Sequence, residues 1–73
     1  MPERFGELLR GIRRNSGKTL GDVARLLGVS VVYVSDVERG NRKPFDNERI
    51  LRIARYLDGN AAALIRAADL EPP

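Results

Sequence analysis

Apolar residues recur at helical spacing in successive segments of the chain. Pro2 and Glu3 are residues that favour the first turn of a helix, and they precede the first of these segments. Glycine, proline and polar residues separate the segments from one another. Their stripes comprise Phe5, Leu8, Leu9 and Ile12; Leu20, Val23, Ala24 and Leu27; Val34 and Val37; Ile50, Ile53, Ala54 and Leu57; and Leu64 with Ile65 in the alanine-rich segment from Ala61 to Ala68. No segment has the alternation of a strand. The pattern therefore predicts an all-α protein with about five helices.

The second and third helices are closely joined between Thr19 and Gly40. Thr19 is a good N-cap residue, and Gly28 suits the end of the helix that follows it. Only Val29 separates this glycine from Ser30, a second N-cap candidate, and Gly40 ends the next helix. Ala24 supplies a small side chain where two closely crossing helices meet. This arrangement predicts a helix-turn-helix over residues 19–40.

The signals after Gly40 mark the ends of the remaining helices. A polar, basic loop over residues 40–44 ends in a proline, and Asp46 is the expected N-cap of the fourth helix. Phe45 and Ile50 have the spacing of a hydrophobic staple around that cap. Asp58-Gly59-Asn60 interrupts the pattern and caps the fifth helix, and residues 71–73 read as a tail.

The third helix has an exposed stripe of its own. On a helical wheel the inner or adjoining positions are Ser30, Val31, Val34, Val37 and Glu38, whereas Val32, Ser35, Asp36 and Arg39 lie opposite. A solvated face is one interpretation of the outer stripe. Val32 argues against it, because an apolar side chain there has no interior to enter, and a major groove admits a helix of this kind.

Composition narrows the chemistry. The 73 residues contain neither cysteine nor histidine, which excludes disulfides, His/Cys metal sites and thiol or imidazole catalysis. We therefore expect no cofactor, no metal and no enzymatic activity. The sequence has no membrane-span or signal-peptide pattern, so we expect a cytoplasmic protein. Lys and Arg total 13 against 10 Asp and Glu, and the excess of arginine suits phosphate and guanine, although a GC-rich genome would also produce it.

This order of elements resembles the Cro/C1-type (XRE, lambda-repressor-like) DNA-binding domain over about residues 4–65. The resemblance is carried by residues 8–13, Thr19, Val23-Ala24, the run 27–30 and the stretch from Val34 to Gly40. It implies one five-helix domain over residues 1–73, in which helices two and three form the helix-turn-helix. It also implies an ion pair between Arg13 and Glu38, since a carboxylate on the inner side needs a partner.

In that family the start and outer side of the third helix read bases. The corresponding positions here are Val31, Val32, Ser35, Asp36 and Arg39. The valines could pack on thymine methyl groups and Ser35 could bond to several bases. Asp36 could accept from cytosine or orient Arg39, which could bind guanine or a phosphate. For Val31, a core contact under the turn is the alternative.

Contacts to the DNA backbone are expected from polar residues around the motif. The candidate phosphate-contacting residues are Lys18, Thr19, Tyr33, Asn41, Arg42 and Lys43. For Tyr33, the alternative is packing against the second helix, and for any single one of the others it is solvated surface. Leu20 occupies a position where relatives carry glutamine, and Gly21 weakens the same helix.

The resemblance implies a transcriptional regulator, a repressor, that binds double-stranded DNA as a homodimer on a palindromic site. The expected dimer surface is helix five with its tail, residues 60–73, through Leu64, Ile65 and Leu70; closure of the monomer core is the alternative for Leu64 and Ile65. A second hypothesis is a protein-interaction module of the same fold. The missing glutamine and the apolar Val31 and Val32 favour it, whereas the basic loop argues against it.

Overall fold

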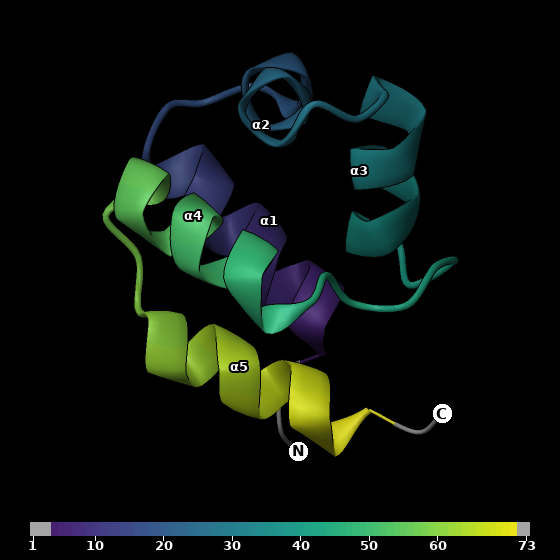
Figure 1. Ribbon diagram of the computed structural model, residues 1–73, viewed down its shortest axis with the longest axis vertical. Helices are drawn as coiled ribbons and strands as arrows, with labels where there is room; N and C mark the ends of the chain where they lie inside the picture. The colour runs from purple at the N-terminus through teal and green to yellow at the C-terminus, as the bar shows by residue number, and fades with distance from the viewer. Residues whose placement is uncertain (1–3, 72–73) are drawn as a thin grey trace.

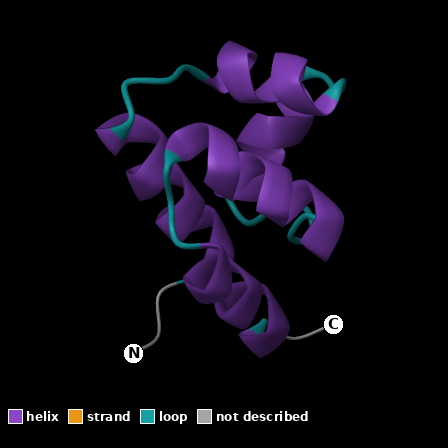
Figure 2. Ribbon diagram, turned by 60° about the vertical axis from the view of Figure 1, so that its left-hand side comes forward, coloured by secondary structure: helices purple, strands orange, loops and turns teal. Residues whose placement is uncertain are grey.

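The computed structural model describes residues 4–71 and contains five helices within them, with no strand in that range (Figures 1 and 2). They are α1 (Phe5–Asn15), α2 (Leu20–Leu27), α3 (Val31–Glu38), α4 (Asn47–Leu57) and α5 (Ala61–Leu70). In Figure 1, α2 and α3 occupy one end of the molecule and α5 the other, with α1 and α4 between them. The predicted all-α, five-helix fold is confirmed.

Two helix boundaries differ from the expected ones. α1 begins at Phe5 after an extended Arg4, whereas the first turn was expected at Pro2 and Glu3, which lie outside the described residues. α5 continues to Leu70, two residues beyond the expected end at Ala68. The reason is that Asp69 and Leu70 carry no breaking signal, and the chain becomes extended only at Glu71.

Polar side chains begin four of the helices as the sequence predicts. Thr19, Ser30, Asp46 and Asn60 each accept a hydrogen bond from the backbone N–H three residues on. Asp22 also accepts from the Thr19 backbone N–H at 2.9 Å, which completes a capping box at α2. These caps satisfy N–H groups that have no partner within their own helix.

The turn between α2 and α3 depends on a left-handed residue. Gly28 has φ 70°, and the Val29 N–H donates to the Ala24 carbonyl at 3.0 Å while the Gly28 N–H donates to Arg25 at 3.4 Å. These two bonds form a Schellman motif. The next residue, Ser30, already caps α3, so the chain passes from one helix to the next through only three residues.

α4 also ends in a left-handed residue, but here that residue is an aspartate. Asp58 has φ 53°, and the Gly59 N–H bonds to the Ala54 carbonyl at 2.8 Å. A β-carbon at position 59 would lie 2.8 Å from the Ile12 side chain. The glycine is therefore placed where the loop crosses α1, and Asp58 takes the conformation that glycine usually provides.

The core draws on all five helices and on Phe45 from the loop before α4. Its largest fully buried side chains are Phe5, Leu9, Val23, Val34, Val37, Ile50, Ile53 and Leu64. The prediction that Leu64 contributes to a dimer surface is wrong, because its side chain is fully enclosed within the monomer. Ile65 is half-buried against the core, and Leu70 is 60% exposed.

Polar contacts between distant segments close the domain. The Glu71 carboxylate accepts from the Phe5 N–H at 2.9 Å, which caps α1 where Arg4 provides no side-chain cap. Arg52 donates to the Leu26 carbonyl at 2.9 Å, so α4 satisfies the end of α2. Glu71, expected in a tail, thus ties the end of α5 to the start of α1.

Candidate nucleic-acid interface

α3 lies at the edge of the molecule, where α2 and α1 support its inner side (Figure 1). Val34 and Val37 are buried in the core, and Glu38 is buried at the end of the helix. The remaining side chains of α3 are exposed or half-buried. The helix is therefore anchored along one side and accessible along the other.

A glycine in α1 allows the close approach that anchors α3. Gly6 is buried, and a β-carbon there would lie 2.5 Å from the Val37 carbonyl oxygen and closer still to that of Glu38. No side chain larger than hydrogen fits between these two backbones without moving one of them. Sequence reasoning missed this contact, although a glycine inside an amphipathic helix is a signal of close backbone approach.

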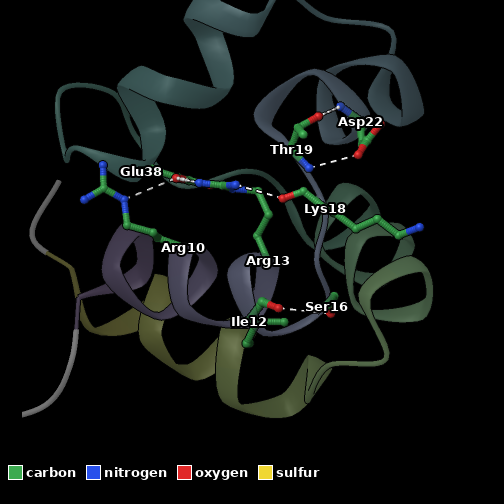
Figure 3. A network of polar contacts seen from close by, with 8 residues as sticks. All are labelled: Arg10, Ile12, Arg13, Ser16, Lys18, Thr19, Asp22 and Glu38. Carbon is green, nitrogen blue, oxygen red and sulfur yellow. Dashed lines mark hydrogen bonds and ion pairs between the residues drawn. The ribbon is translucent and has the colours of Figure 1, made fainter.

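The end of α3 is also held by a buried ion pair (Figure 3). Arg13 donates through Nε to Glu38 Oε2 at 2.7 Å and through Nη2 to Oε1 at 3.1 Å. Its third nitrogen donates to the Lys18 carbonyl at 2.9 Å. The two side chains are 10% and 1% exposed. The structure thus brings together the two residues that the resemblance paired.

Electrostatics and a second arginine reinforce this contact. The hydrogen bond to Glu38 raises the pKa of Arg13, against an opposing effect of burial, so the guanidinium stays charged. Arg10, one turn earlier on α1, places Nε 3.5 Å from Glu38 Oε1 (Figure 3). Arg10 was not singled out from the sequence; its position three residues before Arg13 is the signal that could have identified it.

The five candidate base-reading residues occupy the accessible side of α3 and its end. Val32 is 67% exposed and Val31 47% exposed. The wheel places Val31 beside the inner side, and in the structure it is the first residue of the helix and is exposed. Ser35 and Asp36 are half-buried one turn later, and Arg39 is exposed at the helix end. All five can be reached from one side of the motif.

The candidate phosphate contacts at the start of α2 are engaged within the protein. The Thr19 hydroxyl accepts from the Asp22 N–H at 3.0 Å. The Lys18 ammonium lies 5.0 Å from the centre of the Tyr56 ring on α4. Hydrogen bonds from the Thr19 backbone and side chain lower the pKa of Asp22, which keeps a negative charge at this helix end. Both candidates thus already have a partner within the protein, and their contact to a phosphate stays a prediction.

The candidates after α3 are more accessible. Asn41, Arg42 and Lys43 are all exposed in the loop that leaves the helix. Tyr33 is half-buried and packs its ring against Phe45, with ring centres 5.4 Å apart. The Arg42 guanidinium carbon lies 3.7 Å from the centre of the Tyr33 ring. The aromatic neighbour of Tyr33 therefore comes from the loop after α3.

No cluster of metal-binding side chains occurs among residues 4–71. No helix in the same range is long and apolar enough to cross a membrane.

The class of protein follows from these features and from comparison with known sequences. The chain belongs to the helix-turn-helix domain family, whose match covers residues 4–68. It is similar to the uncharacterized HTH-type transcriptional regulator YazB of Bacillus subtilis, with 34% identity over 97% of this chain and 93% of YazB. It is also similar to the transcriptional regulator ClgR of Mycobacterium tuberculosis, with 43% identity over 42 residues, 58% of this chain. That match spans only 38% of the length of ClgR.

Proposed function

We propose that this chain is a transcriptional regulator of the Cro/C1 type that places α3 in the major groove of double-stranded DNA. The observation that carries the proposal is the two-sided character of α3. One side is fixed by buried contacts to α1 and α2, and the other presents Val31, Val32, Ser35 and Asp36 without competition from the core. The names of YazB and ClgR, both regulators, support the same assignment.

The chemistry of the accessible side favours specific bases. Val31 and Val32 present methyl groups that suit the C5-methyl of thymine. Ser35 donates or accepts a hydrogen bond, and Asp36 accepts from a cytosine amino group. Arg39 at the helix end can bind guanine through two hydrogen bonds. The proposed site therefore contains both thymine and a G·C pair.

Contacts to the DNA backbone come from the loop after α3. Arg42 and Lys43 carry positive charge there, and Asn41 adds a neutral donor. Because phosphate contacts release counterions, each one contributes about −0.9 to the slope of log K against log salt concentration. The binding constant is expected to fall steeply as salt rises.

We further propose a homodimer on a palindromic site, acting as a repressor by occupying promoter DNA. Ile65 and Leu70 are the apolar residues of α5 that remain available for a partner, since Leu64 is buried. Sedimentation at micromolar concentration tests this proposal. A Leu70→Ser variant is expected to shift the protein toward monomer, and a wild type that sediments as a monomer with and without DNA would contradict it.

The interface is tested by a nuclear magnetic resonance titration with a short duplex at low salt. We expect the amide shifts of residues 31–43 to change most, and those of α5 to change only through dimerisation. Changes confined to α5, or none, would contradict the proposal. The second candidate function is a protein-interaction module. It is favoured by Leu20, which stands where relatives carry glutamine, and by the exposed Val31 and Val32. Shift changes confined to α5, or no shift changes, would support this second candidate.

A further inference from the structure

Four flat side chains, contributed by α1, α3 and the loop after α3, form a stack that reaches from the core to the surface. Phe5 and Phe45 are buried and meet edge to face, with ring centres 6.4 Å apart. Phe45 then packs against Tyr33 at 5.4 Å, with the rings inclined by 34°. The exposed Arg42 guanidinium completes the series, 3.7 Å from the centre of the Tyr33 ring.

We propose that Tyr33 is a positioning residue that holds the Arg42 guanidinium ready for a DNA phosphate. This inference rests on the proposed function and assigns Tyr33 a role through its ring. The sequence had suggested a direct contact from its hydroxyl instead. The base of the stack is fixed, because Phe45 lies in the core and the following residue caps α4.

The geometry suits this role. With its carbon 3.7 Å from the ring centre, the Arg42 guanidinium is close enough to the Tyr33 ring to contact it through its flat surface. In that arrangement the N–H donors around its edge stay free for phosphate oxygens. A long arginine side chain normally loses rotamer freedom when it binds. An arginine already held on a ring loses less of that freedom on binding, so the contact gains affinity from preorganisation.

The stack itself is tested in the free protein by nuclear magnetic resonance. Protons of the Arg42 side chain above a ring are expected to resonate upfield of those of Arg25, whose side chain is 84% exposed. The displacement persists in Tyr33→Phe and disappears in Tyr33→Leu. Equal Arg42 shifts in wild type and Tyr33→Leu would overturn the inference before any DNA is added.

The effect on DNA is tested with the tightest-binding duplex from a random pool. Tyr33→Leu is expected to weaken binding about two- to fivefold, the strength of an exposed cation–π contact, and Tyr33→Phe to bind as wild type. Arg42→Gln lowers the salt slope by about 0.9. In the Arg42→Gln background, Tyr33→Leu has no further effect, because the group that it positions is absent.

Controls separate positioning from loss of structure. Arg55→Gln removes one exposed charge at the end of α4 far from α3 (Figure 1), and Tyr33→Leu remains as harmful in that background as in wild type. Thermal unfolding followed by circular dichroism fixes a temperature at which every variant is folded. Additive effects of Tyr33→Leu and Arg42→Gln, or a loss in Tyr33→Phe, overturn this inference alone. A wild type that binds no duplex overturns the proposed function as well.

Discussion

Replacing Glu38 with alanine is the perturbation for which the structure gives the clearest magnitude. The carboxylate accepts two hydrogen bonds from Arg13 and lies 3.5 Å from Arg10 Nε. Without it, the Arg13 guanidinium keeps only the Lys18 carbonyl as a partner and stays nearly buried. Breaking a buried pair by removing one member costs about 3–5 kcal/mol, because the remaining charge is uncompensated.

That loss is large for a domain of this length. At about 0.05–0.15 kcal/mol per residue, its total stability is about 4–11 kcal/mol. A loss of 3 kcal/mol lowers the thermal midpoint by about 12–24 °C. Arg13 has a raised pKa, so its contribution to the free energy of unfolding is fully present below the ordinary arginine pKa. That contribution is lost only as the pH rises through the raised value. A melt at neutral pH therefore measures the whole effect.

The assay is thermal unfolding by circular dichroism, with Glu7→Ala as the matched control. Glu7 is an exposed glutamate on α1, and its removal is expected to change stability by at most about 0.5 kcal/mol. Arg13→Ala should cost nearly as much as Glu38→Ala, and the double variant less than the two losses added together. Equal midpoints for Glu38→Ala and Glu7→Ala would refute the reasoning.

Three further predictions concern single residues and use unfolding measurements. Gly6→Ala should destabilise the protein by about 1–3 kcal/mol because the added β-carbon meets the backbone of α3. Gly11→Ala, which adds a β-carbon into open space on the same helix, should stabilise it by up to about 1 kcal/mol. Stability changes of the same sign in the two variants would contradict this packing. Asp58→Gly should stabilise by about 0.5–1 kcal/mol by relieving the left-handed backbone, and a loss would contradict that account. Asp22 has a lowered pKa, so its contribution to the free energy of unfolding is present above the ordinary aspartate pKa of about 3.9 and is lost as pH falls through the lower folded value. The difference in stability between wild type and Asp22→Ala should therefore be constant near neutral pH and disappear in acid. A difference that persists in acid would be inconsistent with this linkage.

The sequence predicted the parts of the fold that depend on local chemistry. Thr19, Ser30 and Asp46 cap helices because their side chains reach a nearby backbone N–H, and Gly28 turns the chain because it lacks a β-carbon. Such signals involve residues only a few positions apart. They were enough to predict the helix-turn-helix. They also predicted which side of α3 faces outward, except in its first turn, where Val31 is exposed.

Apart from the Arg13–Glu38 pair, which the resemblance implied, features that depend on contacts between distant segments were missed. A wheel treats Leu64 as an apolar residue on a short helix, but only the packing of α5 on the rest of the core shows that it is enclosed. The close approach at Gly6 requires the crossing of α1 and α3. Tyr33 meets Phe45 because the loop after α3 folds back, which no local pattern encodes.

The central claim is that this chain reads double-stranded DNA, and selection from a pool of random duplexes tests it most directly. The purified protein should enrich one palindromic sequence, with half-sites about one helical turn apart. Its affinity for that sequence should fall steeply between two salt concentrations, with a slope of about −0.9 for each phosphate contacted. A pool that shows no enrichment at low salt would contradict the account and favour a protein partner instead.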